Sequence, residues 1–208
     1  MQQDHPGTIR VEITLDVICA ASYVAFTRLR HVLGEVRAGG THVDVAFRPF
    51  QLAPASDFDG RPLLDVLREM FGPQVVEETE RAAAEAVRDG VVLDYRAAVA
   101  AGTFEAHRLI ASAAREGLAE PMVERLFRAH FTDGLNIADP AVLARLADEV
   151  GVSSSDASVE GLRRDLALVR SRGVRSVPQI SVDGGPTLVG QRSAEEYRQA
   201  LGAVRAAS

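Results

Sequence analysis

Residues 8–23, TIRVEITLDVICAASY, decide the fold. Apolar and polar residues alternate through 8–17, and this period of two, with β-branched side chains, is typical of a strand. The only cysteine of the chain, Cys19, follows almost at once. After it, apolar residues recur at helical spacing until Gly39 and Gly40 stop the pattern. The segment therefore predicts a strand, one cysteine and then a helix.

A second alternating segment follows at 42–50. Strand, helix and strand within so short a stretch predict a βαβ unit with a parallel crossover. From 53 to about 158 every apolar pattern is helical, which predicts an all-helical block. The helices expected in it are 63–70, 77–88, 104–115, 121–130 and 140–150.

The rest of the chain predicts a helix from about 159 to 172, strands at 179–182 and 187–189, and a final helix. The turn Asp183-Gly184-Gly185 is typical of an antiparallel hairpin. Ser193 and Glu196 have the spacing of a capping box for the last helix. The expected order is βαβ, a helical block, then αββα.

Composition excludes several classes of partner. The formal net charge of −6, with 23 basic residues all of which are Arg, provides no basic surface for a nucleic acid. No stretch approaches the roughly 20 apolar residues of a membrane span, and residues 1–7 do not have the pattern of a secretory signal. One cysteine permits neither an internal disulfide nor a structural zinc site, so we expect a cytoplasmic protein without a metal.

Together these features resemble the DsbA family of thioredoxin-fold proteins, in particular its FrnE-like branch. The matching segments are Asp16-Val17-Ile18-Cys19-Ala20-Ala21-Ser22-Tyr23, Arg48-Pro49-Phe50-Gln51-Leu52, residues 103–109, residues 124–131 and Ser176-Val177-Pro178. The resemblance implies an α/β thioredoxin-like fold with a long helical insertion. The expected domains are 8–52 with 159–206, thioredoxin-like, and 53–158, inserted.

The departures from this family concern its chemistry. Where the family has two cysteines, this chain has Cys19 and Ser22, with Ala20-Ala21 in place of Pro-Trp. A hydroxyl cannot attack or hold a disulfide, so Ser22 cannot release a mixed disulfide as a second cysteine does. Turnover as a two-cysteine oxidoreductase is excluded.

Cys19 and Ser22 remain the expected catalytic pair. The start of a helix offers free N–H groups and a positive dipole end, which favour a thiolate, so we expect a lowered pKa for Cys19. Ser22 can donate a hydrogen bond to the same sulfur. The alternative is that Cys19 is a small buried apolar residue without reactivity.

The resemblance also implies substrate- or thiol-binding residues. It implies a cis Val177–Pro178 bond, with the Val177 backbone facing Cys19 and docking a peptide or thiol. Tyr23 and His107 are assigned to the same binding role. For His107 and His130 the alternative is a partly buried helix histidine with a local hydrogen bond. Apolar candidates for the cleft are Leu52, Phe58, Met70, Phe104 and Phe131.

Three functions remain open. The first is a DsbA-like thiol oxidoreductase in which Cys19 forms a mixed disulfide that an external thiol resolves. The second is an isomerase or transferase that uses a thiol cofactor, such as glutathione, on a small, aromatic or polyketide-type substrate. The third is a non-redox binding or accessory protein. We expect an enzyme without a tightly bound cofactor. Its expected partner is a small molecule or a thiol or disulfide substrate, and the formation of a homodimer stays an open question.

Overall fold

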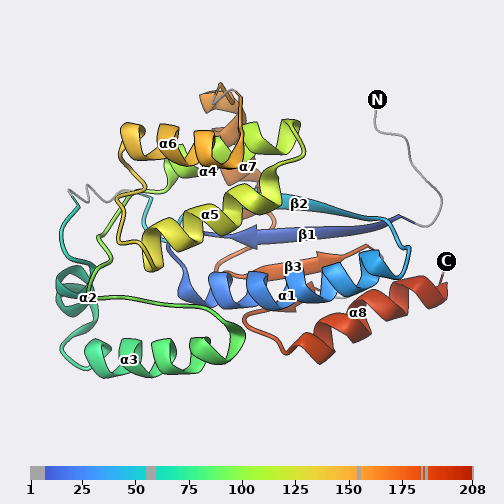
Figure 1. Cartoon of the computed structure of the whole chain (residues 1–208), viewed down its shortest axis with the longest axis horizontal. Coiled ribbons are helices and arrows are strands. Elements are labelled where there is room, and N and C mark those ends of the chain that lie inside the picture. Colours follow the sequence, from blue (N-terminus) through green and yellow to red (C-terminus); the bar gives the residue numbers. More distant parts are fainter. Residues whose placement is uncertain (1–7, 55–59, 154–155, 184, 186, 208) are drawn as a thin grey trace.

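The computed structural model describes residues 8–54, 60–153, 156–183, 185 and 187–207. Residues 205–207 are described by their backbone alone. The structure is an α/β fold with a four-stranded sheet; in the view of Figure 1, α1 and α8 lie in the lower half, α4–α7 lie in the upper half, and β1 runs between them. The strands are β1 Ile9–Leu15, β2 Val43–Pro49, β3 Gln179–Val182 and β4 Thr187–Val189. The helices are α1 Ala20–Ala38, α2 Leu63–Phe71, α3 Val75–Ala86, the 3₁₀ turn η1 Val87–Asp89, α4 Phe104–Arg115, α5 Ala119–Phe131, α6 Pro140–Val150, α7 Val159–Ser171 and α8 Ala194–Ala207.

The sheet has the strand order β2-β1-β3-β4. β1 pairs parallel with β2, from Ile9 opposite Val43, and antiparallel with β3, where Ile13 lies opposite Ile180. β3 and β4 pair antiparallel. The βαβ unit and the later hairpin are confirmed. The β1–β3 pairing joins the segments that precede and follow the helical block.

Apolar alternation places one core between the sheet and its helices. Ile13 and Leu15 of β1 and Phe26 of α1 are buried, and Leu126 and Phe127 of α5 belong to the same cluster. The helices α4, α5 and α6 therefore share the core of the sheet. Of the buried residues described in α2 and α3, only Ala86 belongs to this cluster, so these two helices pack at its edge.

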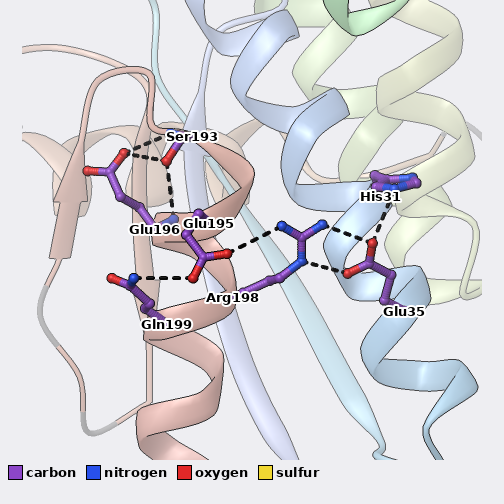
Figure 2. A network of polar contacts seen from close by, with 7 residues as sticks. All are labelled: His31, Glu35, Ser193, Glu195, Glu196, Arg198 and Gln199. Atoms are coloured by element: carbon purple, nitrogen blue, oxygen red, sulfur yellow. Dashed lines mark hydrogen bonds and ion pairs between the residues drawn. The ribbon is translucent and has the colours of Figure 1, made fainter.

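Helices α1 and α8 contact each other along their length, and polar side chains link them at the surface (Figure 2). Arg198 donates to both carboxylate oxygens of Glu35, at 2.8 and 3.0 Å, and His31 lies 3.2 Å from the same carboxylate. The capping box of α8 is confirmed. Ser193 Oγ accepts from Glu196 N at 3.2 Å, and Glu196 Oε2 accepts from Ser193 N at 2.8 Å.

Helix ends follow their capping residues. α6 begins as expected after Asp139, which accepts from Ala141 N at 2.8 Å, and ends before Gly151 at a φ of 86°. α5 begins at Ala119 rather than Pro121, because a proline is tolerated in a first helical turn, where its missing N–H has no intrahelical partner. α3 also begins two residues earlier than predicted, at Val75.

Two residues named in the sequence analysis lie outside the described residues: Phe58, a candidate for the cleft, and Gly184, in the turn between β3 and β4. The boundaries proposed for the inserted domain, 53 and 158, stay a prediction. Arg48 forms an ion pair, with its Nε 2.6 Å from Glu12 Oε2.

Candidate functional site

Cys19 is the N-cap of α1. β1 ends at Leu15, a short turn follows in which Cys19 N donates to Asp16 O at 3.0 Å, and Cys19 O accepts the first helical bond from Tyr23 N at 3.0 Å. The backbone of Cys19 is extended, with φ −95° and ψ 108°, and no side chain caps the helix. The first-turn N–H groups of α1 are therefore directed toward the Cys19 side of the helix start.

Val177 lies opposite Cys19. The thiol Sγ donates to the Val177 carbonyl oxygen at 3.8 Å, across 158 positions of sequence. The Val177–Pro178 bond is cis, and Pro178 is buried where β3 begins beside β1. Within the described part of the chain, the Val177 N–H donates no hydrogen bond. The sheet therefore places one free backbone donor next to the only thiol.

Ser22 lies in the first turn of α1 and is 1% exposed. Its Oγ has no hydrogen-bond partner among the residues that the structure describes. A buried hydroxyl without a partner costs free energy of folding, on the order of 1–3 kcal/mol. Because this hydroxyl lies close enough to Cys19 to favour an ionised sulfur, it can donate to a thiolate once one forms.

Burial raises the pKa of the Cys19 thiol above its ordinary value. The Ser22 hydroxyl and the N–H groups of Ser22 and Ala21 act in the opposite direction, while the charge of Asp16 adds to the rise. The prediction of a lowered pKa is therefore wrong. The helix start does favour the thiolate, as expected, but desolvation of the half-buried side chain is the larger effect.

Asp16 is fully buried beneath the site and was not assigned a role from the sequence. Its Oδ2 accepts from Leu52 N at 2.8 Å, which fixes the chain after β2. His107, 3% exposed, donates from Nε2 to the Phe50 carbonyl at 2.8 Å, and that nitrogen is 3.4 Å from Asp16 Oδ1. The local hydrogen bond expected for a helix histidine is present, while a binding role of His107 stays a prediction.

His130 is completely buried in the last turn of α5. Neither ring nitrogen has a hydrogen-bond partner in the described chain, and the ring packs edge-on against Phe131 at 4.5 Å between centroids. Burial lowers the pKa of His130 to about 4, against a smaller opposing effect of Asp16. The side chain is therefore neutral at pH 7, unlike an ordinary proton-transfer histidine.

Aromatic side chains form the wall between the site and the core. Tyr23 is 6% exposed and stacks on Phe127 at 4.8 Å, so it packs within the core; its assignment to substrate binding stays a prediction. Tyr95, which no sequence pattern indicated, packs against Phe131, and burial together with the Cys19 charge raises its pKa to about 12. Tyr95 therefore lies within electrostatic range of Cys19, which only the packing of the chain reveals.

The remaining cleft candidates differ in exposure. Leu52 and Met70 are 50% and 58% exposed, Phe104 is partly buried, and Phe131 is 1% exposed. Within the described ranges no cluster of His, Cys, Asp and Glu has the arrangement of a metal site. Nor is any helix there both long and apolar enough to cross a membrane.

Comparison with known proteins gives one family and several similar structures. The family model of the DSBA-like thioredoxin domain matches residues 10–202. A probable DsbA oxidoreductase from Streptomyces coelicolor is similar at 26% identity and a TM-score of 0.83, over 96% of this chain and 91% of that one. No curated protein matches the sequence.

Two further structures share the fold. A cytosolic disulfide reductase, DsbM, from Pseudomonas aeruginosa is 22% identical with a TM-score of 0.61, over 96% of this chain and 100% of that one. A 2-hydroxychromene-2-carboxylate isomerase is 17% identical with a TM-score of 0.67, over 94% of this chain and 95% of that one. One architecture thus carries both disulfide chemistry and isomerisation among the similar structures.

Proposed function

We propose, since this chain belongs to the family of DSBA-like thioredoxin domains, that it is a thiol oxidoreductase acting through a single cysteine, Cys19. The observation that carries the proposal is the position of Cys19 Sγ, 3.8 Å from the Val177 carbonyl and at the open start of α1. A disulfide substrate docks its backbone or amide groups on Val177 and presents one sulfur to Cys19.

The reaction is a thiol–disulfide exchange in two steps. The Cys19 thiolate attacks one sulfur of a disulfide, so that a Cys19 mixed disulfide forms and the other substrate sulfur leaves as a thiolate. An external thiolate then attacks the substrate sulfur of the mixed disulfide. This step regenerates the Cys19 thiolate and forms a disulfide between the external thiol and the substrate. Ser22 contributes a hydrogen bond to the Cys19 thiolate and no electrons.

The raised pKa of Cys19 sets the pH dependence of this reaction. The thiol is protonated at pH 7, and only the small ionised fraction reacts. The rate of exchange therefore rises with pH through neutrality and beyond the ordinary cysteine pKa. A reducing cytoplasm that holds an abundant low-molecular-weight thiol such as glutathione supplies the resolving partner.

A second candidate is an isomerase or transferase that uses a thiol cofactor. It is favoured by the Ser22 hydroxyl, which is buried, has no partner in the described residues and lies at the helix start. A bound cofactor thiolate would accept that hydrogen bond while Cys19 stays neutral. A DsbM structure, from one of the proteins that share this fold, contains glutathione, which makes glutathione the natural probe for this chain.

Intact-mass spectrometry separates these functions. The reduced protein is incubated with glutathione disulfide; we expect one glutathione adduct on the native chain and none on Cys19→Ser. Adding reduced glutathione should remove the adduct. An unmodified native chain would sink the proposal.

The Cys19→Ser chain supplies the matched test of the second candidate. Saturable glutathione binding to this variant, measured by titration calorimetry, combined with an unmodified native chain would favour the cofactor-dependent enzyme. The absence of both adduct and binding would leave the non-redox binding protein.

A further inference from the structure

A small hollow lies between α1 and α3, at the start of the helix that Cys19 caps, and Gln191 of the segment after β4 also lines it. Its volume is about 170 Å³. Ala20 and Ala21, the two residues that follow Cys19, form one wall, and α3 forms the facing wall. Its apolar lining consists of Ala20, Ala21, Val24, Ala82, Ala86 and Leu93. A group held here contacts the two residues that directly follow Cys19 in the chain.

The size and lining of the hollow fit a single six-membered ring. An enclosed apolar cavity of roughly 150 Å³ accommodates benzene. This hollow has a similar volume, but it is partly open, and Arg28, Glu85, Asp89 and Gln191 add polar lining to its apolar walls. Four alanine methyl groups line the facing walls of α1 and α3, and the longer side chains Arg28 and Glu85 of these helices also line the hollow.

The charges at the mouth limit what such a ring can carry. Arg28 is held by both oxygens of Asp89, each at 2.7 Å, and donates to the Arg192 carbonyl at 3.1 Å, so it is not free to bind an anion. Glu85, exposed at the rim, forms no ion pair within the described chain. One uncompensated negative charge therefore faces the ligand and disfavours a carboxylate on it.

We infer that this hollow is a binding subsite for one uncharged or cationic aromatic ring, carried by the thiol or disulfide substrate of Cys19. The inference rests on the proposed function. The Cys19 thiolate attacks a diaryl disulfide, the aryl sulfur–sulfur bond breaks, a Cys19–aryl disulfide forms and the second aryl thiolate leaves. The ring retained on Cys19 occupies the hollow between α1 and α3.

Exchange kinetics with two neutral probes test the size of the subsite. Dipyridyl disulfide is the aromatic probe and bis(hydroxyethyl) disulfide the aliphatic one. Ala82→Leu fills the hollow, and Ala84→Leu, an exposed alanine on the same helix, is the matched control. For Ala82→Leu we expect the half-saturating concentration of the aromatic probe to rise on the order of tenfold, as apolar contact is lost. The aliphatic probe and the control variant should show no change; equal effects on both probes would overturn the inference.

A charge variant tests the role of Glu85 at the mouth of the hollow, and its result does not depend on whether Ala82→Leu folds. Glu85→Gln should accelerate the reaction with an aromatic disulfide that carries a carboxylate on each ring, severalfold at low salt. The reaction with dipyridyl disulfide should be unchanged. Equal rates for the carboxylated probe in both proteins would contradict the assigned role of Glu85.

Direct binding distinguishes a failure of the subsite from a failure of the proposed function. Phenol is titrated into the Cys19→Ser chain labelled at its alanine methyl groups and observed by NMR. We expect shifts for Ala20, Ala21, Ala82 and Ala86 and none for Ala84. Such shifts in a protein whose native form reacts with no disulfide would keep the subsite and reject the oxidoreductase. Unshifted methyl groups would reject the subsite itself.

Discussion

Helices α1 and α8 lie side by side (Figure 2), yet their first turns are built in opposite ways. At α8, Ser193 and Glu196 satisfy each other's backbone N–H groups, and two glutamates face the positive end of the helix dipole. At α1, Cys19 is the N-cap, no side chain caps the turn and no acidic residue lies in it. The first turn of α8 stabilises the fold, whereas that of α1 is left open to a thiolate or a ligand.

The region beneath the start of α1 extends this contrast. Asp16 Oδ1, Ser22 Oγ and both ring nitrogens of His130 are buried without a hydrogen-bond partner among the described residues. Each such group weakens the folded state. Arg192 Nε and Tyr197 Oη, just before and within α8, are buried in the same way, so such groups are more numerous near α1 but are not confined to it.

The largest effect that we expect is a loss of stability in acid, caused by the buried, neutral His130. The pKa of His130 is about 4 in the folded chain and about 6.5 when unfolded, so the unfolded chain binds one more proton between these values. The free energy of unfolding therefore falls as pH drops from 6.5 to 4, by about 3 kcal/mol in total, and levels below that. Urea unfolding across this range measures the fall.

His130→Leu is the control for that measurement, because it removes the titrating group and keeps a side chain of similar size. Its stability should decline less steeply between pH 6.5 and 4 than that of the native chain. Carboxylates titrate in both proteins, so the difference between the two curves is the quantity of interest. Parallel curves would show that His130 is not buried as a neutral group.

Removing the α8 cap should have a smaller effect. Ser193→Ala deletes the oxygen that accepts from Glu196 N and should lower the free energy of unfolding by about 1 kcal/mol. The reactivity of Cys19 should not change, since Ser193 acts on the neighbouring helix. Urea unfolding and the alkylation rate of Cys19, measured on the same samples, check both statements, and a changed alkylation rate would argue against two separate roles.

The corresponding change at α1 should not cost stability, and it should alter the chemistry of Cys19. Ser22→Ala removes a buried hydroxyl without a partner in the described structure, so the free energy of unfolding should rise rather than fall, by about 1 kcal/mol. The pKa of Cys19 should rise further, because that hydroxyl favours the thiolate. The pH profile of Cys19 alkylation should then move to higher pH; an unmoved profile would remove Ser22 from the site.

Much of the fold could be predicted from local patterns. The period of two at 8–17 and the caps at Asp139, Gly151 and Ser193 depend on residues close in sequence, and the structure has those elements there. The helix starts that moved, at Val75 and Ala119, are places without a side-chain cap to mark them. Tyr95 could not be assigned to the site, because its burial against Phe131 and the effect of the Cys19 charge on its pKa depend on how the segment after η1 packs.

The sequence by itself determined the order of strands and helices, the position of Cys19 at a helix start and the loss of dithiol chemistry through Ser22. These properties follow from periodicity, capping and residue identity. The family resemblance already implied that Val177 faces the sulfur, and the structure has it there. The tertiary structure alone decided that burial reverses the expected shift in the Cys19 pKa, and that a hollow opens between α1 and α3. Desolvation and cavity shape depend on which surfaces meet, and that information resides in no single segment.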